Sequence, residues 1–195
     1  MDQLVQMASG QAAKTADEKT GLSEGLAAQV MPMAMAVLMK GLKGNAASAQ
    51  GAEALASALD NHDGAVVDDP TALQNDDVLA DGQKILGHIL GGKQAETERQ
   101  LAQVAGGIDQ SQISSILAMA APAVLGALGK AKREQGLSAS DLAGMLNSEA
   151  KEVEGKVPAQ LGGVLSMLDA DGDGNLNNEA MGLGKRLLGG LFGRK

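Results

Sequence analysis

The sequence predicts an all-α fold, a compact bundle of short helices. Apolar residues make up 44% of the 195 residues but aromatic residues only 1%, so the core must consist of Ala, Leu, Val and Met. Strands favour β-branched and aromatic side chains, and this chain has few of either. Apolar positions recur at helical spacing between frequent glycines, which is typical of short, closely packed helices.

Three pairs of similar segments occur in the same order along the chain, which predicts a duplicated helical unit of about 60 residues. The second pair aligns Pro32 with Pro122 and Lys40 with Lys130. The alternative is chance similarity between stretches rich in Ala and Leu. The pairs are 3–10 with 100–107, 30–40 with 120–130, and 53–59 with 140–146.

The two aligned prolines predict Pro-bent helices. A proline inside a helix lacks an N–H, and its ring clashes with the preceding turn. We therefore expect either a kink at Pro32 and at Pro122, or one helix that ends near Ala120 and another that begins with Pro122. If the unit is duplicated, the two prolines should have similar surroundings.

Capping patterns mark the helices of the second copy. Asp109 and Gln112 have N-cap and N3 spacing before one apolar stretch, and Ser138 and Asp141 would cap the next short helix.

Between the copies, residues 76–90 have the spacing of an amphipathic helix, which Gly91 and Gly92 end before another helix begins at Lys93. Residues 60–75 form a linker. The residues expected to face inward are Val78, Leu79, Ile85, Leu86, Ile89 and Leu90.

These elements predict one compact domain in three parts. A first helical repeat covers 1–69, a second repeat with its preceding helix covers 70–157, and a loop with a C-terminal helix covers 158–195.

Charge and composition narrow the classes of function. A net charge of -8 and a pI of about 4.7 argue against nucleic-acid binding, and no cysteine is present for disulfides or thiol chemistry. The first residues lack a signal pattern, and no run approaches about 18 apolar residues, so we expect no membrane-spanning helix. We expect a soluble cytoplasmic protein, with signal-independent export left open.

Residues 168–182, LDADGDGNLNNEAMG, begin as a calcium loop of the EF-hand type. Three aspartates would supply oxygens at positions one, three and five, a glycine permits the sharp turn at position six, and an asparagine offers its carbonyl at position seven. A second asparagine could reach the ion through water. The predicted Ca²⁺ ligands are Asp169, Asp171, Asp173, Asn175, Asn177 and Glu179, with Gly174 at the turn.

The closing ligand is the irregular feature of this loop. Position twelve, where a bidentate glutamate is expected, is Ala180, and Glu179 comes one residue early. We therefore expect weak affinity, on the order of 10⁻⁵ to 10⁻³ M. The alternative is a polar turn whose aspartates cap backbone N–H groups.

The helix before the loop, within 158–168, is predicted by one apolar face. Leu161, Val164, Leu165 and Leu168 recur at helical spacing.

Two other residue types could carry chemistry. Met31, Met35 and Met39 form one helical stripe, and Met33 faces elsewhere. Thioether sulfurs are soft ligands that suit Cu(I). A core without aromatic side chains, however, needs large flexible side chains such as Met to fill it, so we expect these methionines to pack in the core without metal.

Neither His62 nor His88 has a recognisable catalytic partner in the sequence, and no G-x-S-x-G motif is present. We expect both to be surface or partly buried histidines.

The segment 183–195 combines leucines and Phe192 with basic residues. We expect it to pack on its own domain, to self-associate or to bind a protein partner; contact with an anionic membrane is the alternative, which liposome co-sedimentation with and without this segment would test.

Several stretches together resemble a bacterial family of unknown function of the YidB-like type. They are HDGAVVDD (62–69), ILGHILGGKQAE (85–96), GIDQSQISSILAMAAPAVLGALGK (107–130), LDADGDGN (168–175) and LLGGLFGRK (187–195). The resemblance implies an all-helical, soluble bacterial protein and implies no reaction. We therefore expect a non-enzymatic structural or protein-interaction module that binds calcium. The alternatives are a membrane-surface protein acting through its basic tail and, less favoured, an enzyme using acidic residues in a cleft.

Overall fold

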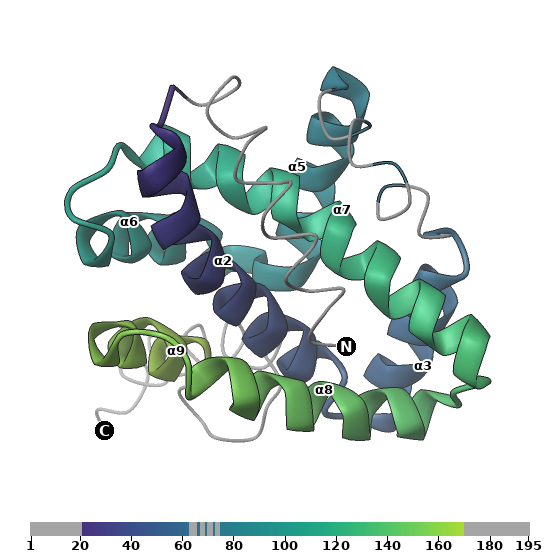
Figure 1. The fold of residues 1–195 in the computed structure, drawn as a ribbon. Helices are drawn as coiled ribbons and strands as arrows, with labels where there is room; N and C mark the ends of the chain where they lie inside the picture. The colour runs from purple at the N-terminus through teal and green to yellow at the C-terminus, as the bar shows by residue number, and fades with distance from the viewer. Residues whose placement is uncertain (1–20, 63–65, 67–68, 70–71, 73–74, 170–195) are drawn as a thin grey trace, which may run out of the picture.

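The structure, a computed structural model, describes residues 21–62, 66, 69, 72 and 75–169 (Figure 1). The predicted all-α fold is confirmed, because the described residues contain helices and turns but no strand. The elements are α2 (Glu24–Asn45), α3 (Ala49–Leu59), α5 (Asp76–Leu90), the 3₁₀ turn η2 (Gly91–Lys93), α6 (Gln94–Val104), α7 (Gln110–Gln135), α8 (Ala139–Glu154), the 3₁₀ turn η3 (Ala159–Leu161) and α9 (Gly162–Leu168).

Helices α2 and α7 form the centre of the bundle (Figure 1). α2 contacts α5, α7, α8 and α9, while α7 contacts α2, α3, α5 and α6. Every residue from Met33 to Met39 and from Ile116 to Gly129 is buried. A helix that is apolar all round is stable only when other elements surround it, so the remaining helices pack around these two.

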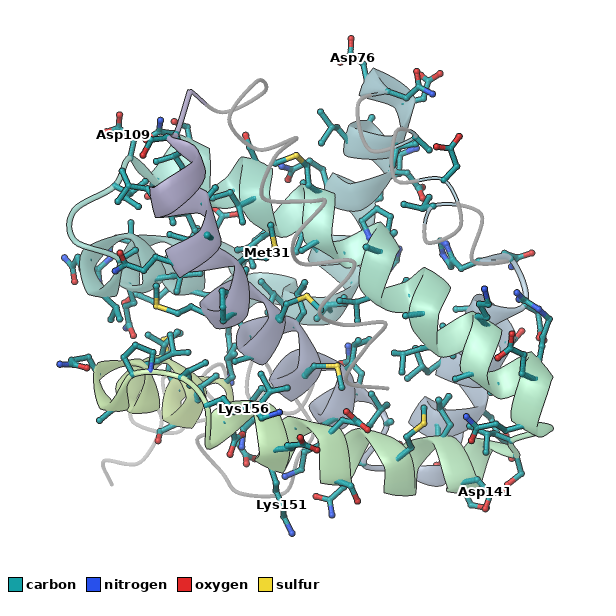
Figure 2. The ribbon with its side chains drawn as sticks, in the orientation of Figure 1. Met31, Asp76, Asp109, Asp141, Lys151 and Lys156 are labelled. Atoms are coloured by element: carbon teal, nitrogen blue, oxygen red, sulfur yellow. The ribbon has the colours of Figure 1, made fainter. Side chains whose placement is uncertain are left out.

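The methionines of α2 belong to the core, as predicted. Met31 and Met33 are each 1% exposed, and Met39 is 7% exposed. Met33 faces away from the stripe of Met31, Met35 and Met39, and it is also buried because other helices enclose α2 on several sides. Figure 2 shows Met31 within the bundle, whereas Asp76, Asp141 and Lys151 lie at its periphery. Flexible thioether side chains fill the space that aromatic rings would otherwise occupy.

The expectation of no membrane-spanning helix is neither confirmed nor contradicted by the described residues, which include two long apolar helices. Gly25–Asn45 and Gln110–Gln135 are long and apolar enough to span a membrane by length and composition alone. That expectation was based on the absence of a long uninterrupted apolar run. The mean hydropathy of a whole helix can still be high when it contains a few Gly, Ser or Pro residues, as these two helices do. In the protein, 67% and 83% of the two apolar windows are buried, so both segments serve as core helices.

Both prolines lie inside continuous helices. The predicted alternative of a helix ending near Ala120 and another beginning at Pro122 is therefore wrong, because α7 runs unbroken through Pro122 and α2 through Pro32. The expected similar surroundings are also wrong, since Pro32 is exposed and Pro122 is buried. Tertiary packing around α7 outweighs the local penalty of a proline there.

The two helix pairs nevertheless pack in a reciprocal way. α2 contacts α8, α3 contacts α7, and each helix also contacts its counterpart in the other pair. By the test set out above, the unlike surroundings of Pro32 and Pro122 count against a duplicated unit, and the reciprocal packing does not by itself show one.

A glycine allows α5 to approach α7 at the buried proline. Pro122 has no N–H to donate to the carbonyl of Ala118, one helical turn earlier. Gly82 of α5 packs directly on that carbonyl, and a Cβ at Gly82 would overlap its oxygen. The missing side chain therefore sets how closely these two helices pack.

The local predictions for the helix ends are largely confirmed. α5 begins and ends as expected, and Gly91 adopts a positive φ of 54° where the helix stops. Ser138 and Asp141 form a reciprocal capping box at the start of α8. Asp109 does occupy the N-cap of α7, but its side chain makes no capping hydrogen bond there.

Two helix C-termini are capped by side chains that are distant in sequence. Asn45, at the end of α2, donates to the carbonyls of His88 and Ile89 at 3.1 and 3.3 Å. Lys132 of α7 donates to the Ala56 carbonyl of α3 at 2.6 Å. Carbonyls at helix C-termini lack intrahelical partners, so these donors attach α5 and α3 to the central helices.

We predict that Gly82→Ala lowers the free energy of unfolding by about 1–3 kcal/mol, because the new methyl group must displace the backbone of α7. Denaturant unfolding followed by circular dichroism measures this change.

The matched control is Gly87→Ala, on the same helix. Gly87 is exposed, and a Cβ there would have no atom within 4 Å. Alanine should stabilise this position by about 0.5–1 kcal/mol through helix propensity. Equal stability of the two variants would show that the Gly82 contact does not determine the packing of α5 on α7.

Candidate functional site

The candidate site lies where α9 ends and the predicted calcium loop begins. Asp169 follows the last residue of α9, and it is the one predicted ligand among the described residues. The other predicted residues lie outside the described part of the chain, as does the segment 183–195. They are Asp171, Asp173, Gly174, Asn175, Asn177 and Glu179.

The helix that carries Asp169 is fixed by its apolar face. Leu161, Val164, Leu165 and Leu168 are all buried, as the spacing predicts. α9 contacts α2 and α6, so its short length is supported from two sides. The first predicted ligand therefore starts from a fixed point on the bundle.

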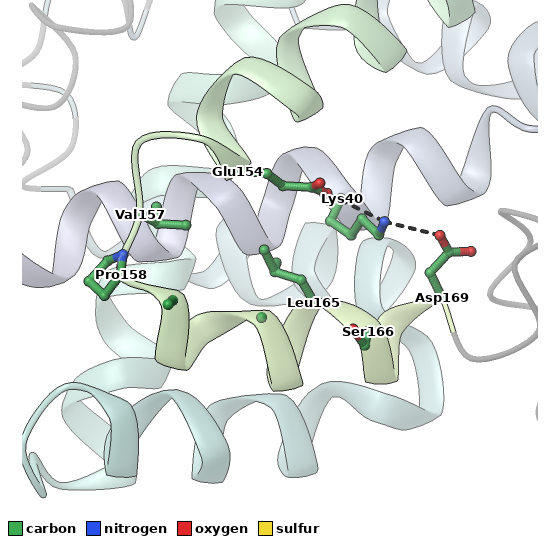
Figure 3. A pocket seen from close by; sticks show the side chains of 9 residues that line it. Lys40, Glu154, Val157, Pro158, Leu165, Ser166 and Asp169 are labelled. Carbon is green, nitrogen blue, oxygen red and sulfur yellow. Dashed lines mark ion pairs between the residues drawn. The ribbon is translucent and has the colours of Figure 1, made fainter.

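Lys40 holds Asp169 in place (Figure 3). Its Nζ lies 3.0 Å from Oδ2 of Asp169 and 3.3 Å from Oε1 of Glu154. The three side chains come from α2, α8 and the end of α9, so one ammonium group connects elements from across the chain.

The Lys40 side chain is only 13% exposed, and its charge depends on the two carboxylates. Burial disfavours the ammonium form, but the hydrogen bond to Asp169 and the negative charges of Glu154 and Asp169 outweigh it and hold the pKa of Lys40 above its ordinary value. A raised lysine pKa adds stability that is present at neutral pH and is lost only as the pH rises through that raised pKa.

Glu154 is less well satisfied than Asp169. Its Oε1 is buried and accepts no hydrogen bond within the described part of the protein, although Lys40 is close enough for an ion pair. The distance thus gives electrostatic attraction without the alignment of a hydrogen bond. Buried polar atoms are usually hydrogen-bonded, so this oxygen retains capacity to accept.

A second lysine binds the end of α9. Lys93 Nζ donates to the carbonyl of Met167 at 2.9 Å and to that of Leu168 at 3.3 Å. A cation at a helix C-terminus satisfies free carbonyls and interacts favourably with the helix dipole. Lys93 comes from the turn between α5 and α6, so it fastens the start of the loop to that corner of the bundle.

A cavity of about 340 Å³ opens beside these charges (Figure 3). Its polar lining combines one ammonium group, two carboxylates and a hydroxyl. The lining residues are Lys40, Glu154, Val157, Pro158, Ala159, Gly162, Leu165, Ser166 and Asp169.

The described residues alone do not form a metal site. They contain no group of three or more His, Asp or Glu side chains placed to hold an ion. At the candidate site they supply two carboxylates, Glu154 and Asp169, and further ligands would have to come from the residues after Asp169.

The two histidines lie away from this site. His88 is exposed on α5, and His62 is partly buried after α3, in agreement with the prediction for both. The carbonyl of His62 packs against Gly129 and accepts a hydrogen bond from Arg133, so this residue takes part in helix packing.

A second cavity, of about 610 Å³, lies between the start of α2 and the turn before α7. Leu26, at its edge, is the large apolar side chain that is exposed in the described structure.

Sequence reasoning missed Lys40, Glu154 and Lys93 as neighbours of the loop. One signal was present for Lys40, because residues 25–39 carry no charge and Lys40 follows them directly. A lysine in such an apolar stretch indicates a partner for a buried ammonium group. Glu154 and Lys93 lie in ordinary charged stretches and carry no comparable signal.

We predict that Lys93→Met lowers the free energy of unfolding by about 1 kcal/mol, because two carbonyls at the end of α9 lose a charged donor. Amide hydrogen exchange should accelerate in α9 more than elsewhere. Lys84→Met is the control, since Lys84 is exposed on α5. An equal response of α9 in both variants would contradict the capping role of Lys93.

Comparison with known proteins identifies a family for the first two thirds of the chain but not for residues 169–179. No curated protein and no solved structure matches the chain. The family described as "Bacterial protein of unknown function (DUF937)" matches residues 2–131, about two thirds of the chain.

The matched range ends within α7, so it includes Lys40 but neither Glu154 nor Asp169. The candidate site thus joins the matched region to the part beyond it. The extent of the match establishes the family: the chain belongs to the bacterial protein family of unknown function DUF937.

Proposed function

We propose that this protein is a non-enzymatic helical module of the YidB-like type that binds Ca²⁺ through residues 169–179. The ion would fasten the C-terminal part of the chain to the helical bundle. In this proposal the apolar segment 183–195 is the surface for self-association or for a protein partner.

The position of Asp169 is the observation that supports this proposal best. A calcium loop needs its first ligand at the end of a helix that is packed on the protein. Asp169 directly follows α9, whose apolar face is buried and whose end is bound by Lys93. The residue proposed as the first ligand therefore follows a helix that is packed on the bundle.

The spacing after Asp169 supplies the rest of the argument. Asp171 and Asp173 follow at alternate positions, and Gly174 stands where the loop must turn sharply. Clustered carboxylates repel one another, and this repulsion favours a bound cation. Ca²⁺ suits such hard oxygen ligands and tolerates an irregular shell better than Mg²⁺, which requires a stricter octahedron.

The surroundings of Asp169 also explain why affinity should be low. Lys40 already neutralises part of its charge at 3.0 Å, so an ion must compete with a resident ammonium group. Together with the irregular closing position, this competition supports a dissociation constant on the order of 10⁻⁵ to 10⁻³ M.

We predict that calcium at about 100 times its dissociation constant stabilises the wild type by roughly 2.7 kcal/mol, which corresponds to a rise of about 5–10 °C in Tm. Asp171→Ala and Asp173→Ala should lose most of this gain, and magnesium should give less of it. Thermal unfolding with increasing calcium measures all three proteins.

The control is the same series without added metal, which separates loss of binding from loss of stability. If millimolar calcium leaves the wild type unchanged, or shifts all three proteins equally, residues 169–179 form a polar turn and the calcium proposal fails.

A further inference from the structure

We infer that Met167 is a site of reversible oxidation, at which hydrogen peroxide converts the thioether to a sulfoxide and the side-chain amide of Gln100 binds the new oxygen. Met167 lies on α9 and Gln100 on α6, so the modification strengthens the contact between these two helices. The inference is independent of calcium binding, because it uses only described residues and no proposed calcium ligand.

Methionine is the residue type through which this chain can respond to an oxidant. The sequence contains ten methionines and no cysteine, so thioethers are its only sulfur groups. Peroxides oxidise methionine to its sulfoxide, and methionine sulfoxide reductases reverse the change. A responsive methionine must be reachable from solvent and must accept an added oxygen without loss of packing.

Exposure divides the described methionines into two groups. An oxygen added to a core methionine would be a buried polar atom without a hydrogen-bond partner, which costs stability. Met145 and Met167 are only partly buried, so a peroxide in solution can reach both. The core methionines are at most 7% exposed, and they are Met31, Met33, Met35, Met39 and Met119.

Met167 differs from Met145 in what its side chain contacts. Met145 packs against the apolar core. The sulfur of Met167 instead accepts a hydrogen bond from Nε2 of Gln100, at a distance of 3.3 Å. A thioether sulfur is a weak acceptor, whereas a sulfoxide is polar. An oxygen added at Met167 therefore meets a hydrogen-bond donor, and one added at Met145 meets apolar side chains.

Two neighbouring contacts hold this donor and the backbone of Met167 in place. Nε2 of Gln100 also donates to Oε1 of Glu96 at 2.6 Å, so one amide hydrogen is held by the carboxylate while the other points to the sulfur. The carbonyl of Met167 accepts from Lys93 at 2.9 Å. The end of α9 thus stays fixed while the flexible methionine side chain turns to bring its new oxygen to the amide.

The reaction is a transfer of one oxygen atom and two electrons. The lone pair of the Met167 sulfur that does not face Gln100 attacks one oxygen of hydrogen peroxide. The S–O bond forms as the O–O bond breaks, and the proton on the transferred oxygen passes to the departing hydroxide. The sulfur is oxidised to the sulfoxide, and the peroxide is reduced to water.

Gln103 provides a matched control for Gln100. It is an exposed glutamine on the same helix, α6. Gln103→Leu removes the same amide group from α6 as Gln100→Leu, but it leaves the donor to Met167 in place. The two variants therefore separate the hydrogen bond to the sulfur from a general effect of replacing a glutamine.

The experiment treats the folded full chain with dilute hydrogen peroxide and follows each methionine by mass spectrometry of its peptides. We expect Met167 to be oxidised faster than Met145 by about threefold or more, and the core methionines to react only on unfolding. After oxidation, amide hydrogen exchange in α9 should slow in the wild type and in Gln103→Leu. It should accelerate in Gln100→Leu, where the sulfoxide has no donor. Methionine sulfoxide reductase should restore the original exchange.

Oxidation of Met145 as fast as Met167 would overturn the inference, and so would an equal response of α9 in Gln100→Leu and Gln103→Leu. Met167→Leu tests whether another methionine is responsible, because a peroxide-induced change in α9 of this variant contradicts the assignment. Circular dichroism checks folding; should Gln100→Leu not fold, the order of oxidation and the response of Met167→Leu still decide. Loss of the calcium proposal leaves all these outcomes unchanged.

Discussion

The constraint on which the structure depends is a core almost without aromatic side chains. Helices filled with Ala, Leu, Val and Met must approach closely to exclude water, and glycine makes the closest approaches possible. Gly82 packs on the carbonyl of Ala118, and Gly129 packs on that of His62. The same constraint encloses α2 and α7 so fully that each resembles a membrane helix in composition.

Enclosure of α2 determines where the charged residue that follows its uncharged stretch 25–39 can go. Lys40 lies at the edge of the core, and its ammonium group ends between Glu154 and Asp169. Lys93 acts beside it on the last carbonyls of α9. Two cations thus fix the point at which the helical bundle passes into the loop. The candidate site therefore combines a residue of the core helix α2, Lys40, with a residue at the end of α9, Asp169.

Local features of the fold could be predicted from the sequence, and features that depend on packing could not. The bounds of α5, the capping box of Ser138 and the buried face of α9 follow from spacing within one segment. The burial of Pro122 within an unbroken helix depends on neighbouring helices, so the expectation that a helix ends before a proline was wrong there. For the site, Asp169 was predicted from its motif, but its pairing with Lys40 requires α2 to lie against α9.

The central claim is that residues 169–179, which begin at the end of α9 held by Lys40 and Lys93, bind calcium. Crystal structures of the full chain with and without millimolar calcium test it most directly. We predict that the calcium form shows an ion bound to Asp169, Asp171 and Asp173. A calcium-soaked crystal that shows no ion bound to these aspartates would contradict the account.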